Sequence, residues 1–437
     1  MNDNPFVNAL KNSFGKYFSA TVFSAIVGML MNKYYTNIFS VEDYGVLSLY
    51  LTFILYLQTY ITFSLDSSWS RLYFEYRNKK KEFFSTIINF SIGSIVFWII
   101  ILLIFESYIQ KILGGSNTMY WGAICVVIVG VFVKIFNILA TLENQASLVR
   151  VQTALQTVCN NVFAIFMIFL NAGILSRIIG NFLGYMTNFV CYLRVLKKCM
   201  LFEYRIIFNK KIFVKLCPFF LSSFLNTAVI STLSYFDRIL LNSYYGAYTV
   251  GIFSLGVLIG QGISMISEAC AKALFPTIIN SLDENYWTGI KQLKKLDNMF
   301  LMVYFFMFAG IYCFRDILVI VFANESYLAA SHVIPLVVLG YITGALYKNV
   351  SGVLLYHKIM WYISFSGIVA YCISAFVNYI LIPVDAEKGA AFALLLGNLL
   401  YSLFLHIRVR KFYFGLIYVL CRHTFILFVG IILYVVV

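Results

Sequence analysis

The stretch that decides the fold is Lys215–Leu255, which reads KLCPFFLSSFLNTAVISTLSYFDRILLNSYYGAYTVGIFSL. A basic residue and Pro218 open an apolar run that exceeds the about 20 residues needed to cross a bilayer. The run carries Asp237 and Arg238 near its far end and stops at a short Tyr/Gly turn. This pattern predicts a membrane-spanning helix with an ionisable pair, and it begins the second half of the chain.

The end of this stretch has a counterpart near the start of the chain. Ser40–Leu49 reads SVEDYGVLSL and Gly246–Leu255 reads GAYTVGIFSL, and each follows an apolar run that ends in a basic residue, Lys33 or Arg238. Parallel halves are a known way of building transporters, with the site between them. The repeat therefore predicts two related halves.

The composition excludes a soluble globular protein. The 437 residues are 62% hydrophobic and 11% charged, whereas soluble chains average about 25% charged residues. The net charge of +14 does not indicate nucleic-acid binding, because the basic residues sit in short loops between apolar runs. The start of the chain, MNDNP, lacks the basic region and cleavage site of a removable signal, so we expect the first helix to remain as an anchor.

Apolar runs of about 20 residues predict an all-α integral membrane protein with about twelve transmembrane helices. Their ranges are roughly 15–39, 45–68, 83–105, 120–142, 151–170, 177–196, 213–236, 251–275, 299–322, 333–355, 361–382 and 389–407. The longest loop, KKCMLFEYRIIFNKK, lies near the midpoint. We therefore expect an N-terminal six-helix lobe over residues 1–204 and a C-terminal six-helix lobe with a hydrophobic tail over residues 205–437.

The distribution of basic residues predicts the orientation. All but seven of the 32 Lys and Arg fall on one side when the N-terminus is placed in the cytoplasm, as the positive-inside rule requires. The tail is ambiguous because Arg422 and His423 interrupt its apolar sequence. We expect an interfacial helix followed by a partial or tilted further span over residues 424–437.

Four motifs, in order along the chain, resemble one family. They are FSVEDYGVLSLY after the first helix, SLDSSWSRLYFE at the end of the second, the Pro-led seventh helix ending in Asp237-Arg238, and ALFPTI at the end of the eighth. The chain resembles the Wzx-type polysaccharide flippases, which carry O-antigen or capsule repeat units, in the multidrug/oligosaccharidyl-lipid/polysaccharide exporter superfamily.

The resemblance implies two six-helix lobes around a central cavity, with no enzymatic active site and no cofactor. The implied substrate is an undecaprenyl-pyrophosphate-linked oligosaccharide, moved by alternating access from the cytoplasmic to the outer face of the bacterial inner membrane. Membrane lipids, the polysaccharide polymerase and the chain-length machinery are the expected partners. Whether the polymer is lipopolysaccharide O-antigen, capsule or another polysaccharide stays open.

Basic residues at membrane depth are the candidate substrate-binding residues, because a sugar-pyrophosphate head cannot cross hydrocarbon unpaired. The expected cationic cavity is formed by Lys33, Lys134, Arg238, Lys272 and Lys348. Lys33 and Arg238 lie 12 and 13 residues before the matched glycines Gly45 and Gly251, which predicts similar depth in opposing lobes. The alternative is that both side chains reach the outer interface from helix ends. For Lys272 and Lys348, the alternative is that topology alone places them near the cytoplasmic ends of their helices.

The candidate acids for coupling or charge pairing are Asp66, Asp237 and Glu268. Asp237 either neutralises Arg238 or belongs to a proton or cation relay. Asn residues on the apolar runs, such as Asn378 and Asn398, bind sugar hydroxyls or join helices.

Two other functions stay open. A multidrug or cation antiporter of the same superfamily would have an acidic or aromatic cavity. A membrane-embedded polysaccharide polymerase or acyltransferase would need a large outer loop or a paired catalytic His, and the sequence has neither pattern. The nine Cys residues show no metal-ligand spacing.

Overall fold

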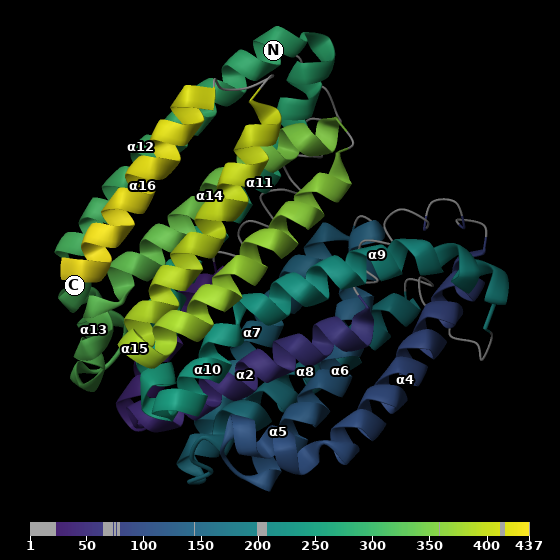
Figure 1. The fold of residues 1–437 in the computed structure, drawn as a ribbon. Coiled ribbons are helices and arrows are strands. Elements are labelled where there is room, and N and C mark those ends of the chain that lie inside the picture. The colour runs from purple at the N-terminus through teal and green to yellow at the C-terminus, as the bar shows by residue number, and fades with distance from the viewer. Residues whose placement is uncertain are drawn as a thin grey trace. The chain divides into compact units, whose positions relative to one another are not determined.

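The computed structural model describes residues 23–63, 73, 76, 79–143, 145–198, 208–357, 359–410 and 416–436. Within these ranges all regular secondary structure is helical (Figure 1), which confirms the predicted all-α class. The chain forms two compact units, Met1–Gly28 with Val46–Thr232, and Met29–Gly45 with Leu233–Val437. Packing therefore groups residues differently from the chain-order division after residue 204, which stays a prediction.

The first unit contains seven helices from the described ranges: α2 (Val41–Thr62, from Val46 onward), α4 (Lys80–Ile104), α5 (Glu106–Leu113), α6 (Asn117–Leu142), α7 (Ala146–Phe169), α8 (Leu175–Lys198) and α9 (Lys210–Ser234, up to Thr232). Helix α9 joins this unit through its first residues. The Asn209 side chain donates to Glu82 Oε2 at 3.0 Å, and its backbone N donates to Thr86 Oγ1 at 3.1 Å. These bonds attach the start of α9 to α4.

The second unit contains α10 (Phe236–Tyr245), α11 (Ala247–Glu284), α12 (Tyr286–Cys313), α13 (Arg315–Phe322), the 3₁₀ helix η2 (Glu325–His332), α14 (Ile334–Tyr356), α15 (Met360–Val409) and α16 (Leu416–Val436). Residues 29–45 belong here too, and 29–38 are helical. Helix α14 packs along α11 and α15, and α15 also packs against α10 and α16.

Seven described helices are long and apolar enough to cross a membrane, or eight if Glu325–His332 and Ile334–Leu346 form one bent span. Several predicted spans have breaks or extensions. Helix α12 begins 13 residues before the predicted start at 299, because its first turns are polar and an apolar-run criterion skips them. Helix α15 combines the predicted spans 361–382 and 389–407, with a kink at Asp385 and Ala386, whose φ is 43°.

The tail forms one described helix, whereas an interfacial helix followed by a separate partial span was expected. Helix α16 runs continuously through Arg422 and His423, from Leu416 to Val436. Both side chains are buried, at 8% and 3% exposure. Arg422 Nη1 donates to Asp297 of α12, and His423 Nε2 lies 3.2 Å from Ser402 Oγ of α15.

The repeated sequences meet in space. A Cβ built on Gly45 would lie 1.8 Å from the backbone O of Ala247, and one on Gly251 would lie 2.3 Å from the backbone O of Val41. Each glycine thus contacts the residue four positions before the other glycine. Such close backbone approach is the role of small residues between membrane helices. The glycines matched by sequence are therefore partners in one helix crossing.

Candidate functional site

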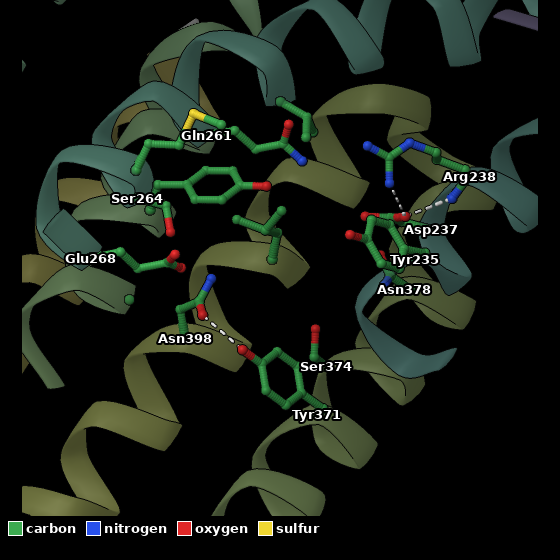
Figure 2. A pocket seen from close by; sticks show the side chains of 15 residues that line it. Tyr235, Asp237, Arg238, Gln261, Ser264, Glu268, Tyr371, Ser374, Asn378 and Asn398 are labelled. Carbon is green, nitrogen blue, oxygen red and sulfur yellow. Dashed lines mark hydrogen bonds and ion pairs between the residues drawn. The ribbon is translucent and has the colours of Figure 1, made fainter. Parts of the chain in front are cut away.

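A pocket of about 390 Å³ lies within the second unit (Figure 2). Helices α10, α11, α14 and α15 supply its walls. The polar lining consists of tyrosines, amides, hydroxyls and three charged residues: Tyr235, Tyr341, Tyr371, Gln261, Asn378, Asn398, Ser264, Ser374, Asp237, Arg238 and Glu268. Amides and hydroxyls can exchange hydrogen bonds with a polar ligand, and tyrosine rings can stack on it.

A helix break places the Asp237-Arg238 pair in this wall. Helix α9 ends at Ser234, Tyr235 leaves helical geometry at φ −121° and ψ 5°, and α10 starts at Phe236. Asp237 therefore lies in the first turn of α10, where the helix dipole favours a carboxylate. Both members of the pair are buried, at 3% and 5% exposure.

Arg238 is held on several sides by the protein itself. Its backbone N donates to Asp237 Oδ1 at 2.7 Å, and its Nη1 lies 3.9 Å from the same oxygen. Its Nε donates to Ser254 Oγ at 3.4 Å. The guanidinium also lies 5.0 Å from the ring centre of Tyr235 and 6.0 Å from that of Phe253. The predicted charge pairing of Asp237 with Arg238 is thus present.

One face of α11 lines the opposite wall in Figure 2. Gln261, Ser264 and Glu268 follow each other by three and four residues, the spacing that puts side chains on one helix face. Glu268 is exposed. It therefore presents a carboxylate to the pocket opening.

The two arms of α15 supply the third wall. Tyr371, Ser374 and Asn378 lie before the kink, and Asn398 lies after it. The Tyr371 hydroxyl donates to Asn398 Oδ1 at 3.0 Å, and Ser374 Oγ donates to the backbone O of Ala393 at 2.6 Å. These bonds join the arms across the kink, so the pocket wall is fixed by the fold before any ligand enters.

The described charges of the pocket are not cationic in sum. Asp237 and Glu268 carry one negative charge each, and Arg238 carries the single positive charge. Lys272 follows Glu268 by one helical turn in α11, and Lys348 lies in α14, but both side chains are outside the described part of the structure. Asp66 is also outside the described residues.

Lys33 lies in the second unit, in the same unit as Arg238, whereas the spacing argument put the two in opposing lobes. It is not among the residues that line the pocket. Its Nζ donates to the backbone O of Ile320 and of Ala323, and the neighbouring Asn32 donates to the O of Phe322 at 2.9 Å. These carbonyls belong to the last turn of α13 and to Ala323, the residue that follows it, and a helix leaves such end carbonyls unpaired. Lys33 therefore caps α13 at the end where a cation is favourable.

Lys134 lies in the first unit, on α6. Its Nζ lies 3.4 Å from Oγ1 of Thr62, at the end of α2, and the side chain is half-buried. The predicted set of five bases is thus divided between the units, and Arg238 is its one member whose described side chain lines the pocket. The Tyr, Gln and Ser lining was missed because these residues are common on membrane helices, and the one available signal was their three-four spacing.

In the described ranges, no group of three or more His, Cys, Asp and Glu side chains is arranged to hold a metal ion. The residues present offer hydrogen-bonding and aromatic groups instead.

Comparisons with known proteins agree with this architecture. A search of curated protein sequences found no match. Among solved structures, the chain is similar to the lipid II flippase MurJ in an inward closed conformation, with 16% identity, a TM-score of 0.73 and coverage of 97% of each chain. It is also similar to the Vibrio cholerae MATE transporter VcmN in the bent form, with 13% identity, a TM-score of 0.59 and coverage of 96% and 99%. The eukaryotic MATE transporter AtDTX14 matches with 12% identity, a TM-score of 0.62 and coverage of 96% and 97%.

At these identities the similarity shows the fold, which is that of MurJ and the MATE transporters. It also supports a multi-pass membrane protein, in agreement with the apolar helices. The model of the family described as polysaccharide biosynthesis protein matches residues 10–281, more than half of the chain. The chain belongs to the polysaccharide biosynthesis protein family.

Proposed function

We propose that this protein is a flippase that moves undecaprenyl-pyrophosphate-linked repeat units from the cytoplasmic to the outer face of the bacterial inner membrane by alternating access. The observation that carries the proposal is a largely uncharged, hydroxyl- and amide-lined pocket in a chain of the polysaccharide biosynthesis family. Sugars bind through hydroxyl groups, which pair with amides and hydroxyls, and through the faces of their rings, which pack on tyrosine.

In this proposal the pocket binds the sugar part of the headgroup. Tyr371, Asn398 and Gln261 are its hydrogen-bonding residues, and Arg238 supplies positive charge toward the pyrophosphate. The N-terminus lies in the cytoplasm, and no bond in the substrate is made or broken. The polysaccharide polymerase and chain-length machinery receive the product on the outer face.

The experiment is complementation in a bacterial strain that lacks this protein. Polymer export and the lipid-linked intermediate on the cytoplasmic face are measured at matched membrane levels of each variant. We expect Asn398→Ala and Arg238→Ala to reduce export and to accumulate the intermediate inside, with partial recovery in Arg238→Lys, because Lys keeps the charge and loses the bidentate geometry.

A matched pair on α15 provides the control. Tyr371→Phe removes the hydroxyl that bonds Asn398, whereas Tyr379→Phe makes the same change at a side chain that is 60% exposed. We expect the first to reduce export and the second to leave it unchanged. Normal export in every pocket variant would contradict the assignment of this pocket, and normal export without the protein in a strain with no other flippase would contradict the function.

A second function has one observation in its favour. The described pocket charges sum to one negative charge and three tyrosines surround them, which suits a cation. A multidrug or cation antiporter would therefore extrude a cationic dye in a manner that depends on Glu268. The antiporter would be favoured over the flippase if the wild type extrudes the dye and the Glu268→Gln variant does not, while polymer export by that variant stays normal.

A further inference from the structure

The second unit buries another group of ionisable side chains outside the pocket. Asp297 comes from α12, His406 from α15, and Arg422 and His423 from α16. Their exposed fractions are 0%, 2%, 8% and 3%. Two of the four histidines in the chain are thus gathered where three helices meet. Charged residues are rarely placed in such positions without a function.

Arg422 joins the three helices. Its Nη1 donates to Asp297 Oδ2 at 2.8 Å, and its Nη2 donates to Nε2 of His406. Nδ1 of His406 lies 2.7 Å from the backbone O of Ser402, which can only accept a hydrogen bond. His406 is therefore neutral, with its proton on Nδ1 and the Nε2 lone pair facing the guanidinium.

His423 lies beside His406, and the centres of the two rings are 5.1 Å apart. Nε2 of His423 is 3.2 Å from Ser402 Oγ. Its contact is with a hydroxyl, which can donate or accept, so His423 is not restricted to one protonation state. His406 is restricted, because a guanidinium has no lone pair to offer a protonated Nε2.

The charge count makes the cluster sensitive to one proton. Asp297 and Arg422 cancel each other while His406 and His423 are neutral. A proton on His406 Nε2 would remove the acceptor of Arg422 and place a second cation beside it. Apolar side chains of the neighbouring core, including Leu293, Leu405 and Val409, prevent water from screening that charge.

The packed helices carry other titratable groups. On α12, Lys294 is half-buried and Lys295 is exposed. On α14, Tyr341 lines the pocket, and the ring centre of Tyr356 lies 5.3 Å from that of His357. The side chain of Lys348 is outside the described part of the structure.

We propose that His406 is a proton-binding site that controls the docking of α16 on α12 and α15. Neutral His406 accepts from Arg422 and holds α16 in place, and protonation at Nε2 breaks this bond and loosens α16. Imidazole is the side chain whose ordinary titration falls between pH 5 and 8. The proposal does not depend on the substrate of the pocket.

The test is hydrogen exchange of the full-length protein in detergent at pH 8.0 and pH 5.5, corrected for the intrinsic pH dependence of exchange. In the wild type, peptides of α16 are expected to exchange faster at pH 5.5. The exchange rate of α16 can rise by at most about tenfold for each pH unit below the titration of the histidine, because each unit changes the neutral fraction of the histidine by that factor. Helices of the first unit serve as the internal reference.

Three substitutions locate the proton. His406→Gln keeps an oxygen that can accept from Arg422 and cannot be protonated in this range, so the pH response of α16 should disappear. His423→Gln should keep the response. His357→Gln is the matched control, because His357 is also half-buried in this unit and bonds Tyr286 at 3.1 Å outside the cluster, and it should keep the response as well.

A wild type without a pH response in α16 would overturn the proposal, and this measurement stands even if His406→Gln fails to fold. A full response in His406→Gln, or its loss in His423→Gln with retention in His406→Gln, would also overturn it. A wild type without a pH response would show that the cluster is a purely structural ion pair. Either of the two results in the variants would show that the proton binds at another residue.

Discussion

Replacing Gly45 by alanine tests the helix crossing that the sequence repeat produces. The added Cβ would lie 1.8 Å from the backbone O of Ala247, whereas real Cβ atoms keep at least 3.0 Å from such neighbours, so the helices must separate by about 1.2 Å. No rotamer change relieves this contact, because both atoms belong to or adjoin the backbone. Overpacking of this kind costs about 1–3 kcal/mol.

The control is Gly93→Ala in α4, a helical glycine whose Cβ would have nothing within 4 Å. It should be neutral or stabilising by up to about 1 kcal/mol, because alanine has the higher helix propensity. The assay is unfolding of each purified variant in detergent, with the wild type alongside. The double variant Gly45→Ala with Gly251→Ala should cost less than the two single changes together, since one separation relieves both contacts. If Gly45→Ala is as stable as Gly93→Ala, the close crossing is absent and the repeat has no structural meaning.

Two further changes test the assigned contacts. Lys33→Met should lower the free energy of unfolding by about 1–2 kcal/mol, because charged hydrogen bonds to the end of α13 are lost. Polymer export per folded molecule should equal that of the wild type. A loss of export in a fully folded variant would instead indicate that Lys33 contacts the substrate. Asp297→Asn should destabilise the protein by about 3–5 kcal/mol, because it leaves the buried Arg422 without its carboxylate. Asp297→Leu combined with Arg422→Met should recover most of that loss in the same unfolding assay. Equal losses in the single and double variants would show that the unpaired charge is not the source of the destabilisation.

The sequence predicted the parts of this protein that depend on local composition. The apolar runs predicted the all-α membrane fold, the gap between the predicted spans 361–382 and 389–407 contains the kink of α15, and the Asp237-Arg238 motif predicted an ionisable pair, which lies at the start of α10. The match of Gly45 with Gly251 was also visible before the structure. These features extend over one or two helical turns, and so neighbouring residues are enough to specify them.

The candidate site was predicted only in part. Arg238, Asp237 and Glu268, which the sequence offered as candidates, line the pocket, as do Asn378 and Asn398, which were named as residues that bind sugar hydroxyls or join helices. The tyrosines, Gln261 and the serines were not identified, because isolated polar residues on membrane helices are common and their number does not show which of them converge.

Sequence alone determined that this chain folds as membrane helices and that Gly45 and Gly251 lie in matched motifs, since apolar runs and short motifs are properties of short segments. Only the tertiary structure decided the partner of each charge: Lys33 bonds carbonyls of α13, 287 and 290 residues away, and Arg422 bonds Asp297, 125 residues away. The helical period shows which face a side chain occupies, but the helix opposite that face is chosen by the packing of the whole unit. A basic residue on an apolar run can therefore cap a helix, join three helices or line a pocket, and the residues beside it in the sequence do not show which of these it does.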